Sequence, residues 1–170
     1  MQTLIKPLTG ILALMLVAGA CLAQDADKSE LEKFFRLDFV VKELDAGKTV
    51  NSRSYFMIVG TPDKGVREIR TGNKVPFEVS TGNWTQIDVG TSFDCSRVKE
   101  VPDGLSLIVT AEVTSILENP TAGPSHPIVR QNKWNSTVMV PLRKPTVIFS
   151  SDDVASKRQM QVELTATPIS

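Results

Sequence analysis

The chain has 170 residues, with 19 lysines and arginines against 19 aspartates and glutamates and a formal net charge of zero. Because no basic stripe or tail is present, the sequence lacks the electrostatic footprint of a protein that binds nucleic acid or an anionic membrane. The length allows one domain with a substantial hydrophobic core.

Residues 1–23 have the composition of a secretory signal peptide. Lys6 is their only charged residue, an apolar run follows it, and the sequence becomes polar directly after Ala23. The run is shorter than the roughly 20 apolar residues that a membrane-spanning helix needs. We expect cleavage after Ala23, with an uncleaved N-terminal anchor as the alternative. Residues 17–21 also resemble a bacterial lipobox, which makes Cys21 the alternative processing and lipidation site.

Export defines the compartment and the redox environment of the mature chain. We expect it in the periplasm or secreted, with association to the outer membrane as a further option. Cleavage after Ala23 leaves Cys95 as the only cysteine, so the sequence predicts no disulfide within the chain. The stability of the domain must then come from a hydrophobic core.

Residues 24–35 form a lead-in to the domain, expected as a short helix or as a disordered segment. The helix alternative rests on Ser29 and Glu32, which have the spacing of a capping box. From residue 36 to residue 170 the sequence predicts a single β domain.

The first two expected strands form a hairpin. Apolar and polar residues alternate from Arg36 to Lys42, and the apolar residues of 55–59 occupy both faces of the second strand. Because Phe56 and Ile58 make its second face apolar, we expect this strand to be covered on both sides. Residues 45–48 are a turn signal between the two strands.

The clearest alternation runs through the middle of the chain. Residues 85–98 are expected as a strand, because every second residue from Ile87 to Cys95 falls on one largely apolar face. Residues 105–113 repeat the pattern. Residues 102–104, Pro-Asp-Gly, are expected to join them as a tight hairpin.

The last third of the chain alternates loops and strands. Residues 118–127 are proline-rich and expected as a loop, 134–140 alternate again, and 145–149 are a short apolar run. Residues 150–157 are polar and turn-like, and residues 160–166 form a closing strand. The total is about eight strands, so we predict an all-β fold, either an antiparallel sandwich or a strongly curved sheet.

No arrangement of residues predicts catalysis. His126 is the only histidine and lies in the proline-rich loop, while Cys95 continues an apolar strand face and is expected to be buried and unreactive. One histidine and one cysteine cannot build a zinc site, and the adjacent Asp152 and Asp153 lack the spacing of a calcium loop. Residues 60–65 lack the ending of a phosphate-binding loop and are expected as a hairpin turn.

We therefore predict that the protein is not an enzyme and that it uses no cofactor, metal or small-molecule ligand. Trp84 and Trp134 leave two alternatives open. They either pack in the core or at a sheet edge, or they line a carbohydrate or peptide site.

The segment from Glu68 to Phe77 resembles the Gly-x-x-Val/Ile-Pro stretch of the bacterial secretin family, the outer-membrane channels of secretion and pilus systems. Further motifs of that family are matched in the same order along the chain, up to the terminal strand at residues 163–169. The residues of this chain that match the family motifs are Arg70, Gly72, Val75, Pro76, Asp88, Gly90, Asp103, Gly104, Pro127 and Arg130.

The chain also departs from the secretin pattern. Residues 142–151 lack the paired glycines expected there, residues 152–157 replace a longer family segment, and no part of the chain resembles the ring-building domains that precede the channel domain. The resemblance therefore implies a truncated, secretin-like sheet module without enzymatic activity. We expect it to self-associate or to bind a cell-envelope protein through its sheets. The alternatives are a subunit of a secretin-like outer-membrane channel and, from another class, a periplasmic hydrolase that uses His126.

Overall fold

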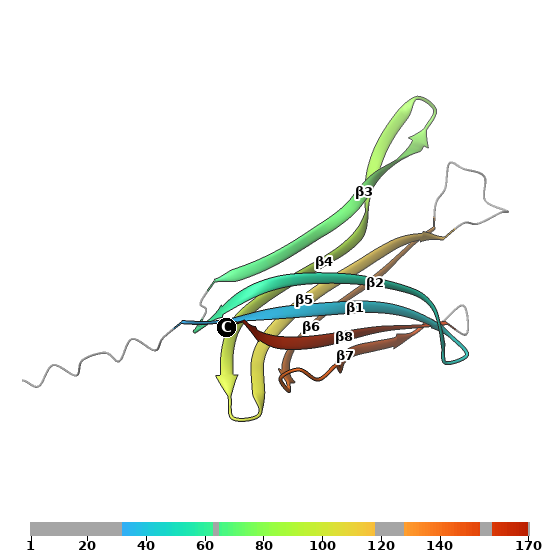
Figure 1. Cartoon of the computed structure of the whole chain (residues 1–170). Helices are drawn as coiled ribbons and strands as arrows, with labels where there is room; N and C mark the ends of the chain where they lie inside the picture. Colours follow the sequence, from blue (N-terminus) through green and yellow to red (C-terminus); the bar gives the residue numbers. More distant parts are fainter. Residues whose placement is uncertain (1–31, 63–64, 118–127, 154–157, 170) are drawn as a thin grey trace, which may run out of the picture.

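A computed structural model describes residues 32–62, 65–117, 128–153 and 158–169. All regular secondary structure in these ranges is β-strand, and the strands form two antiparallel four-stranded sheets, in the orders β2-β1-β8-β7 and β3-β4-β5-β6 (Figure 1). The strands are β1 (Lys33–Asp45), β2 (Lys48–Thr61), β3 (Val66–Ser80), β4 (Asn83–Val101), β5 (Gly104–Leu117), β6 (Ile128–Val140), β7 (Thr146–Asp152) and β8 (Arg158–Ile169). The predicted all-β sandwich of about eight strands is confirmed. Within the described ranges, no helix is long and apolar enough to cross a membrane.

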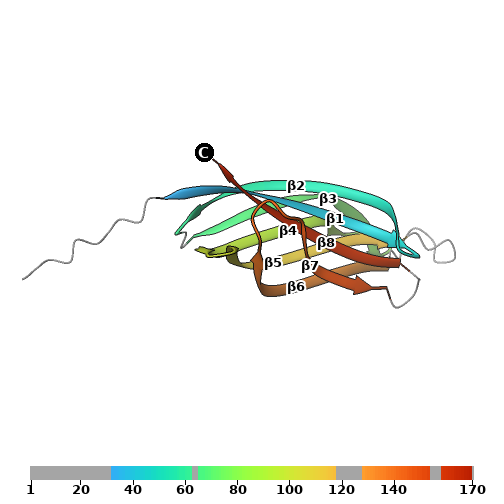
Figure 2. The same ribbon diagram turned by 60° about the horizontal axis from the view of Figure 1, so that its bottom comes forward.

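The two sheets stack face to face, with β2 and β3 along one side of the sandwich and β6 and β7 along the other (Figure 2). The core between them is built by alternate residues of the strands, as the two-residue period predicted. Phe93 of β4 lies at its centre, where it stacks on Phe39 of β1 at 4.4 Å between ring centroids. Each large apolar side chain buried in this way contributes roughly 1.5–3 kcal/mol to folding.

Both predicted tight hairpins are confirmed. Asp45 pairs with Lys48, and the two residues between them have positive φ angles, 48° at Ala46 and 79° at Gly47. Two positive φ angles give the loop a twist that matches the right-handed twist of the strands. Val101 likewise pairs with Gly104 across the second turn.

The start of β1 corrects the expected lead-in. The strand begins at Lys33, so a helix or disordered segment is wrong for residues 33–35, while residues 1–31 lie outside the described part of the chain. The physical reason is burial, because Phe35 is only 1% exposed and packs in the core. Packing of this kind overrides a local capping signal.

Two expected turns are also corrected. Residues 60–65 are not a hairpin turn, because β2 and β3 belong to different sheets and the chain crosses between them here. Residues 150–152 are part of β7 and pair with Gln159–Gln161 of β8, although they are polar. In both cases the local residue types indicate a turn but carry no information on the pairing partner. Residues 118–127 and 154–157 lie outside the described ranges.

One hairpin extends beyond the sandwich, and we call its residues 73–89 the arm (Figure 1). β4 pairs with β5 only from Gly90 onward, where Gly90 faces Thr114. The strands of the arm therefore pair only with each other. At the base of the arm Gly72 faces Gly90. A Cβ atom on Gly90 would overlap the Thr71 carbonyl oxygen and lie 2.5 Å from the Gly72 Cα, so the two backbones approach closely only because both residues are glycine.

Candidate interaction surfaces

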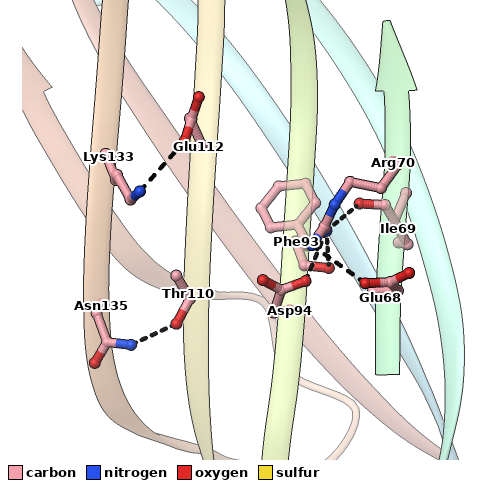
Figure 3. Close-up of polar contacts among 9 residues, drawn as sticks. All are labelled: Glu68, Ile69, Arg70, Phe93, Asp94, Thr110, Glu112, Lys133 and Asn135. Atoms are coloured by element: carbon pink, nitrogen blue, oxygen red, sulfur yellow. Dashed lines mark hydrogen bonds and ion pairs between the residues drawn. The ribbon is translucent and has the colours of Figure 1, made fainter. Parts of the chain in front are cut away.

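The outer face of the sheet β3-β4-β5-β6 carries polar side chains in cross-strand pairs (Figure 3). Arg70 Nη1 lies 2.6 Å from Asp94 Oδ1, and Arg70 Nη2 lies 3.2 Å from Glu68 Oε2. The hydrogen bond to Asp94 raises the pKa of the Arg70 guanidinium further above its ordinary value. Because the Arg70 side chain is half exposed, this cluster orients side chains more than it stabilises the fold.

A second cluster surrounds Glu112 on the neighbouring strand. Gln131 Nε2 donates a hydrogen bond of 2.8 Å to Glu112 Oε1, and Lys133 Nζ lies 3.6 Å from Glu112 Oε2. The hydrogen bond from Gln131 and the charge of Lys133 together lower the pKa of the Glu112 carboxyl. Lys74 and Asp88 form a further pair at 3.0 Å. Each of these basic side chains thus lies beside at least one carboxylate.

An open groove of about 590 Å³ runs over this polar face. Its described lining holds no histidine or cysteine, so the hydroxyls of Ser92 and Thr110 have no histidine beside them to act as a base. Across the described ranges, no group of three or more His, Cys, Asp or Glu side chains could hold a metal ion. The groove can offer hydrogen bonds and paired charges, which suits contact with a protein surface.

The residues that match the secretin motifs do not converge on one site. Arg70, Gly72, Asp88 and Gly90 line the groove. Of the others, Val75 and Pro76 lie on the arm, paired with β4, and Asp103 and Gly104 lie at the β4–β5 turn.

Arg130 lies elsewhere, in a second hollow of about 250 Å³, where its Nη2 is 2.6 Å from Asp153 Oδ2. Pro127, Cys21 and Ala23 lie outside the described residues, as does His126, so the proposed processing sites and the hydrolase alternative stay predictions.

Cys95 and Trp134 are packing residues. Cys95 is completely buried, and desolvation raises the pKa of its thiol to about 12. Trp134 stacks on Phe149 of β7 with 4.0 Å between ring centroids. The expected burial of Cys95 is confirmed, and Trp134 packs against the core. Trp84, at the end of the arm, is 62% exposed.

The outer face of the other sheet carries an apolar patch that the sequence analysis missed. Phe56 and Ile58 of β2 are 59% and 51% exposed, so the expectation that β2 is covered on both sides is wrong. With Phe34 and Ile169, which pair with each other across β1 and β8, they form what we call the β2 patch. The guanidinium of Arg36 lies 4.5 Å above the Phe56 ring within it.

The sandwich has two strand edges on each side, and they differ in length. β2, β3 and β6 have 13 to 15 residues, whereas β7 has seven and a register shift between Val147 and Phe149. None of the four has a second hydrogen-bonded neighbour among the described strands. Such edges present backbone donors and acceptors to another chain.

No family model and no curated protein matches the chain. Solved structures do resemble it. PulD, from the Klebsiella pneumoniae type II secretion outer membrane complex with PulS and the PulC HR domain, has a TM-score of 0.49 and 11% identity over 82% of this chain. XcpQ from Pseudomonas aeruginosa has a TM-score of 0.43 and 12% sequence identity over 81% of this chain. InvG of the Salmonella SPI-1 type III secretion injectisome has a TM-score of 0.49 and 8% identity over 82% of this chain. All three are secretins. Their chains are longer: this chain covers 39% of the PulD chain, 57% of XcpQ and 64% of the secretin InvG.

Proposed function

We propose that this chain is a non-enzymatic module of the bacterial cell envelope that works through its sheet edges, by self-association or by pairing with an envelope protein. The observation that carries the proposal is the set of long strand edges without a second neighbour in the described structure, β2 and β3 on one side and β6 on the other. The order of secretin-type motifs along the sequence supports an envelope location.

The direction of the strands favours a second copy of the chain as the partner. Each sheet has four strands that are all antiparallel to their neighbours, so its two edge strands run antiparallel to each other. When the β2/β3 side of one copy meets the β7/β6 side of the next, both sheets continue as antiparallel sheets. Such a head-to-tail contact repeats from copy to copy.

The side chains near these edges restrict where pairing occurs. Pro76 lies within the arm and cannot donate a backbone hydrogen bond, so residues 66–75 are the part of β3 best suited to pairing. On the other sheet Phe56 of β2 and Val147 of β7, which is 48% exposed, lie on the two edge strands. Head-to-tail pairing brings these two strands together and covers apolar surface there.

The experiment measures the mass of the chain by size-exclusion chromatography with light scattering over a range of protein concentrations. The protein is purified from the periplasm with Cys21→Ser, so that no lipid anchor contributes. We expect the average mass to rise with concentration. If the protein stays strictly monomeric and retains nothing from an envelope extract, the proposal is wrong.

Matched variants test whether the edge makes the contact. Phe56→Lys places a charge on the edge strand β2, opposite Asp38, which can accommodate it in the monomer. Thr165→Lys places the same charge on the same face of the interior strand β8, also opposite Asp38. We expect only Phe56→Lys to lower the multimer fraction, and equal effects would argue against edge pairing.

A subunit of a secretin-like outer-membrane channel is the second candidate, favoured by the order of the family motifs in the sequence. It predicts multimers that resist heat in detergent and sediment with the membrane fraction. The paired charges on the outer face of β3-β4-β5-β6 oppose contact between that face and lipid, because burying ion pairs is costly. An entirely soluble chain would exclude this candidate.

A further inference from the structure

The end of the arm exposes two large apolar side chains. Val79 is 58% exposed and Trp84 is 62% exposed, and they lie on either side of the turn that connects β3 to β4. The arm carries this end away from the sandwich (Figure 1).

The end of the arm has one charged group beside it. From Val79 to Thr85 the sequence has no charged side chain. The charged group is the Glu78 carboxylate, because Glu78 lies directly opposite Trp84 across the two strands. Its Oε1 accepts a hydrogen bond of 2.7 Å from the Gly82 N–H, within the turn itself. Contact at the depth of the lipid headgroups leaves this carboxylate in a polar layer, so it does not require moving the charge among the acyl chains.

The shape of this end suits contact with a lipid surface better than binding of a sugar or a peptide. Neither of the two hollows described above is lined by residues 75–87. A sugar or a peptide needs a concave site with several polar groups to orient it. A projecting end with one exposed tryptophan instead fits the boundary between lipid headgroups and acyl chains, where the indole ring is apolar and its N–H can reach water.

The base of the arm holds this end in place. Val75 and Ile87 pair directly across the two strands and are only half exposed, and the backbones of Gly72 and Gly90 are in close contact where the arm leaves the sheet. The arm thus presents Val79 and Trp84 without a rearrangement of the core.

We propose that the end of the arm inserts Trp84 and Val79 into the interface of a lipid bilayer. Because no basic cluster accompanies them, insertion depends on apolar burial and not on anionic lipid. Two side chains bury less apolar surface than a single acyl chain, which by itself gives only marginal and reversible membrane binding. The contact is therefore weak and reversible, and it does not depend on edge pairing.

Tryptophan fluorescence tests this directly, since the chain has only two tryptophans. In the Trp134→Phe variant, Trp84 is the only reporter. The periplasmic protein with Cys21→Ser is titrated with phosphatidylcholine vesicles to millimolar lipid. We expect a blue shift of the emission, quenching by lipids brominated on their acyl chains, and the same result at high salt and with added phosphatidylglycerol.

Control variants separate insertion from other causes. Val79→Ser should weaken partitioning into the vesicles several-fold. Met139→Ser removes a 67% exposed side chain near the C-terminal end of β6, outside the arm, and should not change partitioning. If Trp134→Phe does not fold, the difference between the spectra of the unmodified protein and Trp84→Phe reports the same residue.

Two results would overturn the proposal. One is the absence of a shift and of quenching at millimolar lipid. The other is a blue shift without lipid that follows protein concentration, which would mean that a second copy covers the end of the arm. A multimer seen by light scattering with no response to vesicles would leave the proposed function standing and reject insertion.

Discussion

At the scale of single residues, two sites show how little room the close packing of the strands leaves. Gly72 and Gly90 meet where β3 and β4 leave the sheet, and no side chain fits between their backbones. Cys95 fills a completely buried position of β4 as a small apolar group. Each has a measurable consequence.

A valine at position 90 should destabilise the fold. In Gly90→Val the new side chain overlaps the backbone of residues 71 and 72, so the arm or the sheet must shift. We expect a loss of about 1–3 kcal/mol in the free energy of unfolding, measured by urea denaturation. Ser92→Ala, on the same face two residues away, is the control and should stay close to the unmodified protein.

The thiol of Cys95 should make stability depend on pH in the alkaline range. Burial raises its pKa from an ordinary 9.0 to about 12 in the folded protein, so above pH 9 the unfolded chain loses a proton that the folded chain keeps. The stabilising effect of this difference is complete below pH 9 and declines between pH 9 and pH 12, by up to about 1.4 kcal/mol per pH unit. Urea unfolding from pH 7 to pH 10.5 should show this decline, and Cys95→Ala should lack it.

At the scale of the elements, β7 is the weakest strand because it is short, irregular and at an edge. Its link to the opposite sheet is the ring of Phe149, stacked on Trp134 of β6 at an interplanar angle of 12°. This contact closes the β6/β7 side of the sandwich. The other side relies on Tyr55 of β2, whose ring lies 5.7 Å from that of Phe93.

Removing the Phe149 ring should open that side. We expect Phe149→Ala to cost about 2 kcal/mol, less than a fully buried phenylalanine because the site is partly exposed. Val147→Ala, on the exposed face of the same strand, should cost much less. If the two variants lose equal stability, the stack does not hold β7.

At the scale of the whole molecule, both sheets share one core. Phe93 contacts Phe39 in the opposite sheet and meets Trp134 edge-on, so neither sheet can be removed without exposing the other. A structure of this kind unfolds as one cooperative unit.

Thermal unfolding should therefore show a single transition. In Trp84→Phe the emission reports only Trp134 in the core, while far-UV circular dichroism reports all strands. We expect the two probes to give the same midpoint. Separate midpoints would show that the sheets unfold independently.

Sequence reasoning was most accurate where one face of a strand is buried and the other is exposed to solvent. In β5 and β8 the side chains alternate between the core and solvent, so faces and hairpin turns could be read directly. It failed at residues 66–80, which are polar on both faces for much of their length and were recognised only as a motif. It also failed at Phe56 and Ile58, because an apolar pattern cannot distinguish a face covered within the chain from one left free.

The sequence by itself determined the alternating strands, the two tight hairpins and the burial of Cys95, because these depend on neighbouring residues and on the preferences of short turns. Only the tertiary structure decided that the hairpins divide between two sheets, that β1 pairs with β8, and that the arm leaves the sheet at Gly90. Those features follow from pairing between strands far apart in the chain. Their energy depends on how whole sheets pack together, which no local pattern contains.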